Sequence, residues 1–250
     1  MYDDTLNTGT TAPQARPAEQ ESRPPLDDPR ELTAHALGLM RGSGGAGRVI
    51  LGLTGPPGAG KSTLARHLVA EVCRTEGPAA AAYLPLDGFH LSNAQLDRLG
   101  LRTRKGAPNT FDARGYAALL RRVAEDRFHD IYGPDFDRAL DEPVAARHLV
   151  TPGTRLVVTE GNYLGTAGTP WSEARGLLRE LWYVDADDAV RDERLVRRHM
   201  AGGQTEADAR HRVSSNDHPN GEYVKAARDT CTRSVRVARL PQTAGPRSVD

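Results

Sequence analysis

Residues 55–62 read Gly55-Pro56-Pro57-Gly58-Ala59-Gly60-Lys61-Ser62, and they fit GxxxxGK[ST], the pattern of phosphate-binding loops (P-loops). Glycines here allow backbone conformations and close approaches that a Cβ atom forbids. The exposed N–H groups then surround phosphate oxygens at a helix N-terminus, whose dipole favours negative charge. We expect the loop and the following Thr63 to bind phosphates, with Lys61 reaching the β- and γ-phosphates and Ser62 holding Mg²⁺.

Composition and flanking sequence support this interpretation. The chain has 33 Lys plus Arg, but lysine occurs only at positions 61, 105 and 225. In so lysine-poor a sequence, a chance match is expected well under ~1% of the time. Residues 48–54 read as a short buried strand, and residues 62–73 read as a helix. The sequence therefore predicts a protein that binds a nucleotide.

The bulk properties narrow the class of protein. With 250 residues the chain can form one sizeable core, and its formal net charge is zero. This charge balance argues against a broad surface for nucleic acid or anionic membrane. Cys73 and Cys231 are far apart and lack a CxxC partner, so neither a disulfide framework nor a zinc site is indicated. No apolar run approaches ~18 residues, and we expect a cytoplasmic protein.

The chain divides into four segments by composition. Residues 1–28 predict a disordered tail because they contain few large apolar residues. Residues 29–47 predict a short helix and a Gly-rich linker, and residues 241–250 a C-terminal tail. Between them, residues 48–240 alternate strand and helix patterns. This alternation predicts an α/β three-layer sandwich of the P-loop type, with a mostly parallel sheet and helices on both faces.

The expected elements of that domain follow from apolar periodicity and turn signals. The predicted helices cover residues 92–99 and 112–126, and residues 187–230 are helix-rich. Strands are predicted at 80–86, 155–159, 181–184 and 234–240, with short strands around 131–132 and 147–150.

Acidic residues follow three predicted strands, where ligands bind in open α/β sheets. Asp87 is the candidate general base, since phosphoryl transfer to an alcohol needs a carboxylate to accept the hydroxyl proton. The alternative is that Asp87 only caps the next helix. Glu160 suits a carboxylate acting on Mg²⁺, with a structural ion pair as the alternative. Asp185 is interpreted as structural.

Basic residues recur in a loop expected near Asp87 and along one later helix. An i, i+3, i+4 spacing places three arginines of that helix on a shared face. These arginines form either a lid that closes on the phosphoryl group or an ordinary solvated face. The residues are Arg102, Arg104 and Lys105 in the loop, and Arg194, Arg197 and Arg198 on the helix.

Several segments together resemble one family, the P-loop kinases grouped with uridine kinase, phosphoribulokinase and bacterial pantothenate kinase. The resemblance runs from about residue 48 to residue 240. Besides residues 55–63, it is carried by LDGFH at 86–90, RKGAP at 104–108, YGPDFDR at 132–138, VVTEGNY at 157–163 and SNDHPN at 215–220. The sequence is similar overall to nucleoside/nucleotide-kinase-like proteins, some of them associated with sugar uptake.

The resemblance implies an ATP- and Mg²⁺-dependent kinase for a small hydroxylated metabolite. It assigns the base to Asp87, a place near magnesium to Glu160, and a lid to about residues 187–220. Lys61, Arg194 and Arg198 complete the expected catalytic set, and Arg197 joins the nucleotide-binding set. Proteins of this family are often dimers, so a homodimer is expected.

The acceptor remains open among a sugar, a nucleoside and a pantothenate-like compound. Pro134 stands where the pantothenate kinase pattern Tyr-x-His, begun by Tyr132, would have its histidine. The alternative to an acceptor-directed kinase is a nucleotide-dependent switch or regulatory ATPase acting on a protein partner; no guanine-reading Asn-Lys-x-Asp motif is present. The expected acceptor contacts are Phe89, His90, Arg104, Lys105, Tyr132, Asp137 and Tyr163, with core packing as the alternative for the aromatic residues.

Overall fold

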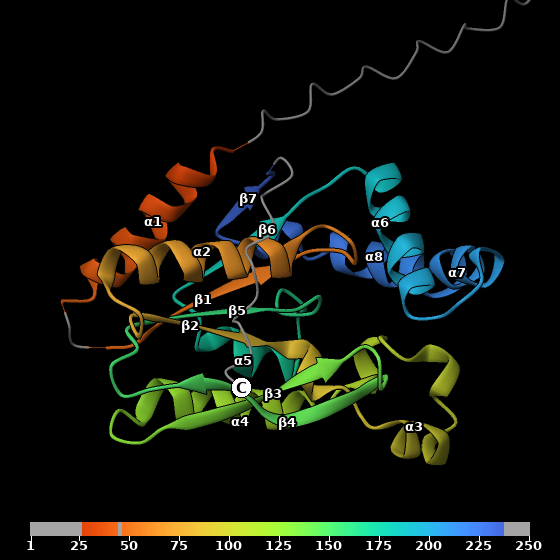
Figure 1. Ribbon diagram of the computed structural model, residues 1–250, viewed down its shortest axis with the longest axis horizontal. Coiled ribbons are helices and arrows are strands. Elements are labelled where there is room, and N and C mark those ends of the chain that lie inside the picture. Colours follow the sequence, from red (N-terminus) through yellow and green to blue (C-terminus); the bar gives the residue numbers. More distant parts are fainter. Residues whose placement is uncertain (1–26, 45–46, 238–250) are drawn as a thin grey trace, which may run out of the picture.

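The computed structural model describes residues 27–44 and 47–237 (Figure 1). Within these residues, five parallel strands form one sheet in the order β2–β5–β1–β6–β7. This arrangement confirms the predicted α/β fold. The strands are β1 (Val49–Thr54), β2 (Ala81–Pro85), β5 (Leu156–Glu160), β6 (Glu180–Val184) and β7 (Arg233–Val235).

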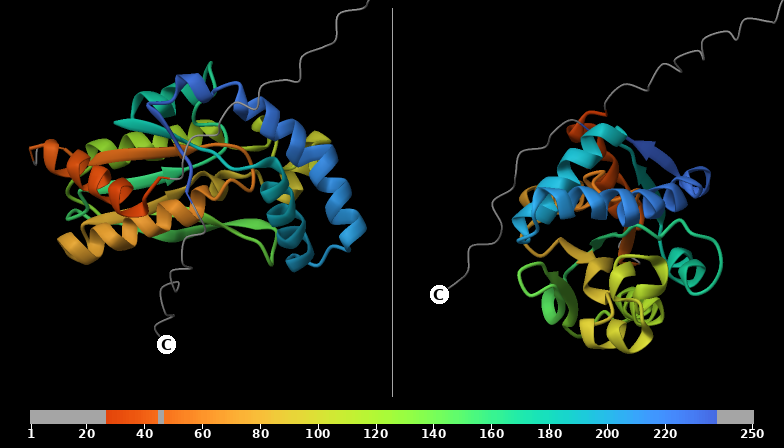
Figure 2. Two further views of the ribbon diagram at one scale, coloured as in Figure 1. Left: turned by 90° about the horizontal axis from the view of Figure 1, so that it is seen from above. Right: turned by 90° about the vertical axis from the view of Figure 1, so that its right-hand side faces the viewer.

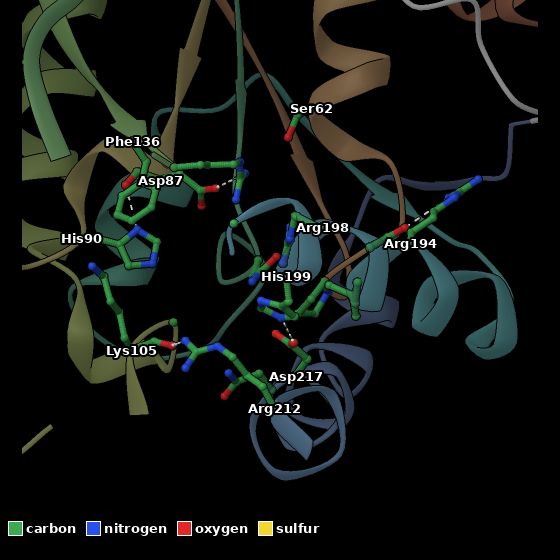
Figure 3. A pocket seen from close by; sticks show the side chains of 18 of the residues that line it. Ser62, Asp87, His90, Lys105, Phe136, Arg194, Arg198, His199, Arg212 and Asp217 are labelled. Carbon is green, nitrogen blue, oxygen red and sulfur yellow. Dashed lines mark hydrogen bonds and ion pairs between the residues drawn. The ribbon is translucent and has the colours of Figure 1, made fainter. Parts of the chain in front are cut away.

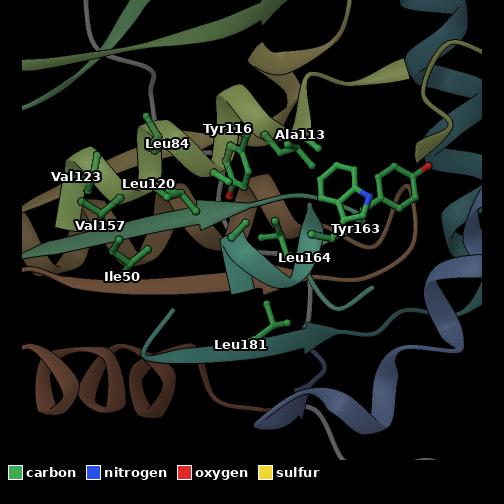
Figure 4. Close-up of a cluster of buried hydrophobic side chains, with 14 of the residues drawn as sticks. Ile50, Leu84, Ala113, Tyr116, Leu120, Val123, Val157, Tyr163, Leu164 and Leu181 are labelled. Carbon is green, nitrogen blue, oxygen red and sulfur yellow. The ribbon is translucent and has the colours of Figure 1, made fainter. Parts of the chain in front are cut away.

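Helices cover both faces of the sheet and complete the three layers (Figure 1). On one face lie α1 (Pro29–Gly42) and α2 (Lys61–Glu76), and on the other α4 (Ala113–Glu125) and α5 (Trp171–Gly176). Alternate strand residues point to opposite faces, so each strand feeds both cores. Figure 4 shows the core under α4, which includes Ile50, Leu84, Tyr116, Leu120 and Val157.

Two further units flank the sheet. An antiparallel hairpin of β3 (Ile131–Asp137) and β4 (Glu142–Val150) lies beside β2, and α3 (Asn93–Leu99) is near its turn. A run of helices that contains the expected lid, about residues 187–220, crosses one end of the sheet (Figure 2), and we call this run the lid below. It consists of α6 (Asp188–Ala201), α7 (Glu206–Arg212), a π-helical turn (Val213–Asp217) and α8 (His218–Lys225). None of the described helices is long and apolar enough to cross a membrane.

Some element boundaries differ from those that the sequence predicts. The hairpin strands are longer than the short strands expected around 131–132 and 147–150, because they pair with each other over most of their length. Asp87 lies in a 3₁₀ turn (Leu86–Phe89) that follows β2. Asp27, expected in the N-terminal tail, forms a bridge with Val237 and belongs with the folded part. Residues 1–26, 45–46 and 238–250 lie outside the described ranges; they include nearly all of the expected N-terminal tail, the whole expected C-terminal tail and two residues of the expected linker.

A buried arginine joins the end of α4 to the loop before β5. Arg48, 7% exposed, donates from Nη1 to the carbonyl oxygens of Val123 (2.5 Å) and Asp126 (3.0 Å). Its Nε donates to Thr154 O (3.0 Å) and its Nη2 to Thr151 O (2.9 Å). One side chain thus donates to carbonyls of a helix end and of a turn; Thr151 O also accepts from Thr154 N (3.0 Å), and Arg48 is the donor to the other three.

Replacing Arg48 with methionine keeps most of the side-chain volume but removes every donor. Because buried carbonyl groups are then left unpaired, we expect Arg48→Met to lower the free energy of unfolding by about 3–5 kcal/mol. Urea denaturation measures the loss. The control is Arg74→Met, which removes an exposed ion pair with Glu71 and is expected to cost under about 1 kcal/mol. Equal losses in the two variants would contradict the role given to Arg48.

Candidate active site

The register of three parallel strands brings the chemically important residues to one edge of the sheet. Leu53 of β1 lies opposite Glu160 of β5, and Glu160 lies opposite Pro85 of β2. The P-loop begins two residues after Leu53, and Asp87 is two residues after Pro85. The P-loop, Glu160 and Asp87 therefore meet at the carboxyl ends of neighbouring strands.

Two glycines permit backbone contacts that shape this edge. Gly55 has φ +142°, and a Cβ there would lie 2.3 Å from the Val184 carbonyl oxygen. A Cβ on Gly88 would lie 2.4 Å from the Pro134 carbonyl oxygen. The first contact seats the P-loop against β6, and the second brings the hairpin against the turn that carries Asp87. Both positions exclude larger residues because the neighbour is backbone.

Lys61 is buried beneath the P-loop. Its Nζ donates to the carbonyl oxygens of Gly55 (2.8 Å) and Pro56 (3.1 Å), and the residue is 7% exposed. Burial lowers the pKa of this ammonium to about 8, although the carboxylates of Glu160 and Asp87 oppose the shift. A bound polyphosphate would favour the charged form and reverse the effect of burial.

The carboxylate of Glu160 is held by two hydroxyl groups. Ser62 Oγ donates to Glu160 Oε1 (2.8 Å), and Tyr83 OH donates to the same oxygen (2.7 Å). Burial raises the pKa of Glu160, and the negative charge of Asp87 raises it further.

The Ser62–Glu160 oxygen pair fits a Mg²⁺ ion. Magnesium in proteins is usually bound through one or two carboxylates, with substrate phosphates and water as further ligands. The described residues include no group of three or more His, Cys, Asp or Glu side chains that could hold a metal by themselves. A magnesium site here would therefore depend on the nucleotide phosphates.

Asp87 lies half-buried among positive charges. Arg138 Nη2 donates to Asp87 Oδ2 at 3.4 Å. Burial alone raises the pKa of this carboxyl, but neighbouring cations outweigh burial and lower the pKa overall. These cations are His90 when protonated, Arg138, Arg198 and Lys61. The carboxylate is therefore ionised at neutral pH and able to accept a proton.

A pocket of about 580 Å³ connects these groups with the hairpin and the lid (Figure 3). It extends from the P-loop past Asp87 to the loop at residues 102–106 and to the lid. The predicted site residues that line it are Pro57, Gly58, Gly60, Lys61, Ser62, Thr63, Asp87, His90, Lys105, Glu160, Arg194 and Arg198.

The lid helix α6 is attached to the P-loop by arginines. Arg191, 2% exposed, donates from Nε to Pro57 O (2.9 Å). Arg194 Nη1 donates to Gly58 O (3.1 Å). Arg198, one turn further along, points into the pocket toward Asp87 (Figure 3). The positions of Arg194 and Arg198 relative to the loop are therefore set by α6.

Arg197, predicted in the nucleotide-binding set, does not line the pocket that Arg194 and Arg198 line. Its Nε donates to Glu193 O (3.1 Å), and its guanidinium pairs with the exposed carboxylate of Glu193 (3.5 Å). At ~100° per residue, the face of α6 toward the pocket is centred on Arg191, Leu195 and Arg198. Arg197 falls well off that face and is exposed to solvent.

Five predicted acceptor contacts do not line the pocket. Tyr132 is 56% exposed on the outward face of β3, and Asp137 pairs with Arg147 at the hairpin end. Phe89 packs edge-on against Tyr116 in the core. Alternation along the strand and packing in the core account for these positions.

The remaining two are Arg104 and Tyr163. Arg104 is exposed and its Nη1 donates to Ser215 O (3.5 Å). Tyr163 is fully buried in the core, and its hydroxyl donates to Gly106 O (2.5 Å). The Arg104 contact ties the loop at residues 102–106 to the lid, and the Tyr163 contact ties it to the core. Neither side chain lines the pocket.

Other residues that line the pocket have no assigned role in the sequence-based prediction. Arg138 lies one residue after Asp137 and reaches Asp87 in its place. His199 donates from Nε2 to Asp217 (2.8 Å), and Arg212 comes from the end of α7. The segments YGPDFDR and SNDHPN, which carry part of the family resemblance, contain Arg138 and Asp217 and were the available signal.

The lowered pKa of Lys61 predicts proton uptake on nucleotide binding. At about pH 8.5 the free lysine is mostly neutral, and bound phosphate favours its ammonium form, so roughly three-quarters of a proton should be taken up per ATP. Near pH 7 the lysine is already charged and uptake should be small. Calorimetric titrations in buffers of different ionisation enthalpy measure the uptake. Lys225→Met should keep it and Lys61→Met should lose it; buffer-independent heats with the unaltered protein at the higher pH would contradict the assignment.

Known proteins resemble this chain over most of its length, although no protein-family model matches it. A Schizosaccharomyces pombe protein, provisionally named a uridine kinase, is 34% identical over 214 residues, which are 83% of this chain and 90% of that protein. YggC, an uncharacterized Escherichia coli protein, is 36% identical over 193 residues, covering 76% of this chain and 78% of YggC.

A solved structure agrees with these relatives. The crystal structure of a Silicibacter protein, provisionally described as a fructose transport system kinase, has a TM-score of 0.72 at 33% identity. The matched region is 81% of this chain and 98% of the Silicibacter chain. With the P-loop and the parallel sheet already described, the chain belongs to the P-loop kinases grouped with uridine kinase and is a small-molecule kinase.

Proposed function

We propose that the protein transfers the γ-phosphoryl group of ATP to a hydroxyl group of a small metabolite, with Asp87 as the general base. One observation carries this proposal: an ionised Asp87 shares a pocket with the P-loop lysine, and the pocket continues beyond both. The ATP-dependent kinase class supplies the donor, and the shape of the pocket leaves room for an organic acceptor next to Asp87.

In the proposed reaction, the acceptor hydroxyl lies in front of Asp87 and its oxygen attacks the γ-phosphorus. The bond from that phosphorus to the β,γ-bridging oxygen breaks, ADP leaves, and the hydroxyl proton passes to the Asp87 carboxylate. Ser62 and Glu160 would hold Mg²⁺, which when bound neutralises charge on the phosphate oxygens. Arg198 and Arg138 stabilise the charge of the moving phosphoryl group.

The other P-loop and lid residues bind and orient. Lys61 and the loop amides bind the β- and γ-phosphates. Arg194 holds the P-loop carbonyls and keeps the lid helix in contact with the loop. The lid covers the pocket from the side opposite Asp87 and excludes water, which favours transfer to the acceptor over hydrolysis.

The second candidate is a switch or regulatory ATPase without a small acceptor. It would use the same P-loop, but the part of the pocket that extends to His90 and Lys105 would have no task. Stimulation of ADP release by an acceptor distinguishes the two functions, since a switch would respond to a protein partner instead.

The base assignment predicts a selective loss of turnover in Asp87→Asn. The amide keeps the shape of the side chain but cannot take the proton, so acceptor-dependent ADP release should fall about 10²–10⁴-fold while ATP binding persists. A coupled assay measures release, and calorimetry measures binding. Asp229→Asn, an exposed site away from the pocket, is the matched control. Full turnover in the Asp87 variant would remove this residue from the base role.

Tyr83 is expected to position Glu160. Tyr83→Phe removes the hydrogen bond to Glu160 Oε1 and leaves the ring in place. Because partners of metal-binding carboxylates usually contribute about 10–100-fold in metal affinity, the Mg²⁺ concentration for half-maximal ADP release should rise by about that factor. Tyr132→Phe, at an exposed ring, should leave the Mg²⁺ dependence unchanged. An unaltered Mg²⁺ dependence in Tyr83→Phe would argue against Glu160 acting on the metal.

A further inference from the structure

The pocket carries more positive charge than negative. Among the residues that the structure describes, seven lysine or arginine side chains and four carboxylates line it. The proposed reaction uses the cations near the P-loop and Asp87 for the nucleotide and the moving phosphoryl group. Arg212 lies beyond them, at the far end of the pocket, and has no task in that scheme.

Arg212 lines the pocket, and most of its guanidinium N–H donors have no hydrogen-bond acceptor among the described residues. It ends α7, is half-buried, and donates from Nη2 to the Lys105 carbonyl oxygen (3.2 Å). Within the described part of the chain, its guanidinium forms no ion pair. Figure 3 shows it across the pocket from Asp87. A guanidinium with unused donors aimed into a pocket is suited to a carboxylate or phosphate.

The carboxylates near Arg212 already have other partners. Asp217 accepts a hydrogen bond from His199 Nε2 (2.8 Å). Asp141 pairs with Lys105 Nζ (3.0 Å). Neither carboxylate is hydrogen-bonded to Arg212, so the guanidinium donors that the Lys105 carbonyl oxygen does not use remain open to a ligand in the pocket.

The aromatic side chains of the pocket offer no open stacking surface for a nucleobase. His90 lies between Phe111 and Phe136, with ring centroids 4.0 Å and 4.8 Å away. Phe111 is also packed against Tyr163, and the Lys105 ammonium lies over the Phe136 ring at 4.8 Å. Base recognition by stacking, which a nucleoside acceptor would favour, is blocked by the protein's own side chains.

We propose that the acceptor is a small hydroxy compound that carries a carboxylate or phosphate group, and that Arg212 binds this anion while the hydroxyl faces Asp87. The inference rests on the proposed function, since it names the substrate class for the same site. A neutral sugar or nucleoside offers the Arg212 guanidinium only neutral hydrogen-bond acceptors, which it binds more weakly than an anion. An anionic group would accept two parallel hydrogen bonds from it.

Matched acceptor pairs test this inference. ADP release is measured with glycerate and glycerol, gluconate and glucose, ribose 5-phosphate and ribose, fructose 6-phosphate and fructose, and with uridine. We expect an anionic member to stimulate release and its neutral counterpart to do so far less. The carboxylate and phosphate arms identify which anion is bound.

The Arg212→Gln variant tests the residue. For the stimulating acceptor its KM should rise about 10–100-fold, while the KM for ATP stays unchanged. Arg210→Gln is the matched control, because Arg210 is exposed on the same helix and pairs with Glu206. The inference is overturned if a neutral acceptor stimulates ADP release as well as its anionic counterpart. It is also overturned if Arg212→Gln raises the KM for ATP as much as the KM for the acceptor. Neither result contradicts the proposed kinase activity.

A binding measurement separates the inference from the proposed function. The same compounds are titrated calorimetrically into protein saturated with Mg²⁺ and a non-hydrolysable ATP analogue. Binding of an anionic compound that is weakened in Arg212→Gln supports the anion site even if no compound is phosphorylated, and in that case the kinase proposal fails. If no anionic compound binds or stimulates release, the anion site is overturned.

Discussion

The pairing register of three parallel strands is the constraint on which the site depends. Leu53, Glu160 and Pro85 stand in one row of the sheet, so the P-loop after β1, the carboxylate at the end of β5 and the turn after β2 emerge together. A parallel strand that slipped by one residue would turn its side chains to the opposite face. The apolar residues that alternate between the two cores therefore also hold the polar residues in register.

Because the strand ends meet, the ionisable side chains of Lys61, Glu160 and Asp87 lie close together and affect one another's pKa values. Lys61 and Glu160 are both nearly buried, and Asp87 lies near both. Burial lowers the pKa of Lys61 and raises that of Glu160, whereas surrounding cations lower the pKa of Asp87. The two carboxylates are thus set apart: one is held by hydroxyl groups beside the P-loop, and the other is kept ionised toward the acceptor space. Different environments give similar side chains different roles.

The sequence reveals the parts of this molecule that depend on local pattern. Residues 55–62 and the alternation of strands and helices predict the P-loop fold, and the ends of two predicted strands select Asp87 and Glu160. Local sequence patterns do not predict which residues tertiary contacts bring into the pocket. Arg138 reaches the pocket through the hairpin, and Arg212 reaches it through the lid. The predicted residues that lie outside the pocket have the same cause, since about a third of a helical turn separates Arg197 from the pocket-facing side of α6 and the pleat of β3 turns Tyr132 outward.

The central claim is transfer of phosphate to an organic hydroxyl rather than to water. Phosphorus NMR of a reaction with ATP, Mg²⁺ and the acceptor pairs tests it most directly, because a phosphate ester and inorganic phosphate give separate signals. The account predicts a new phosphomonoester signal that grows with ADP, and none in a reaction with Asp87→Asn. Inorganic phosphate as the sole product with every acceptor, formed equally by the variant, would contradict it.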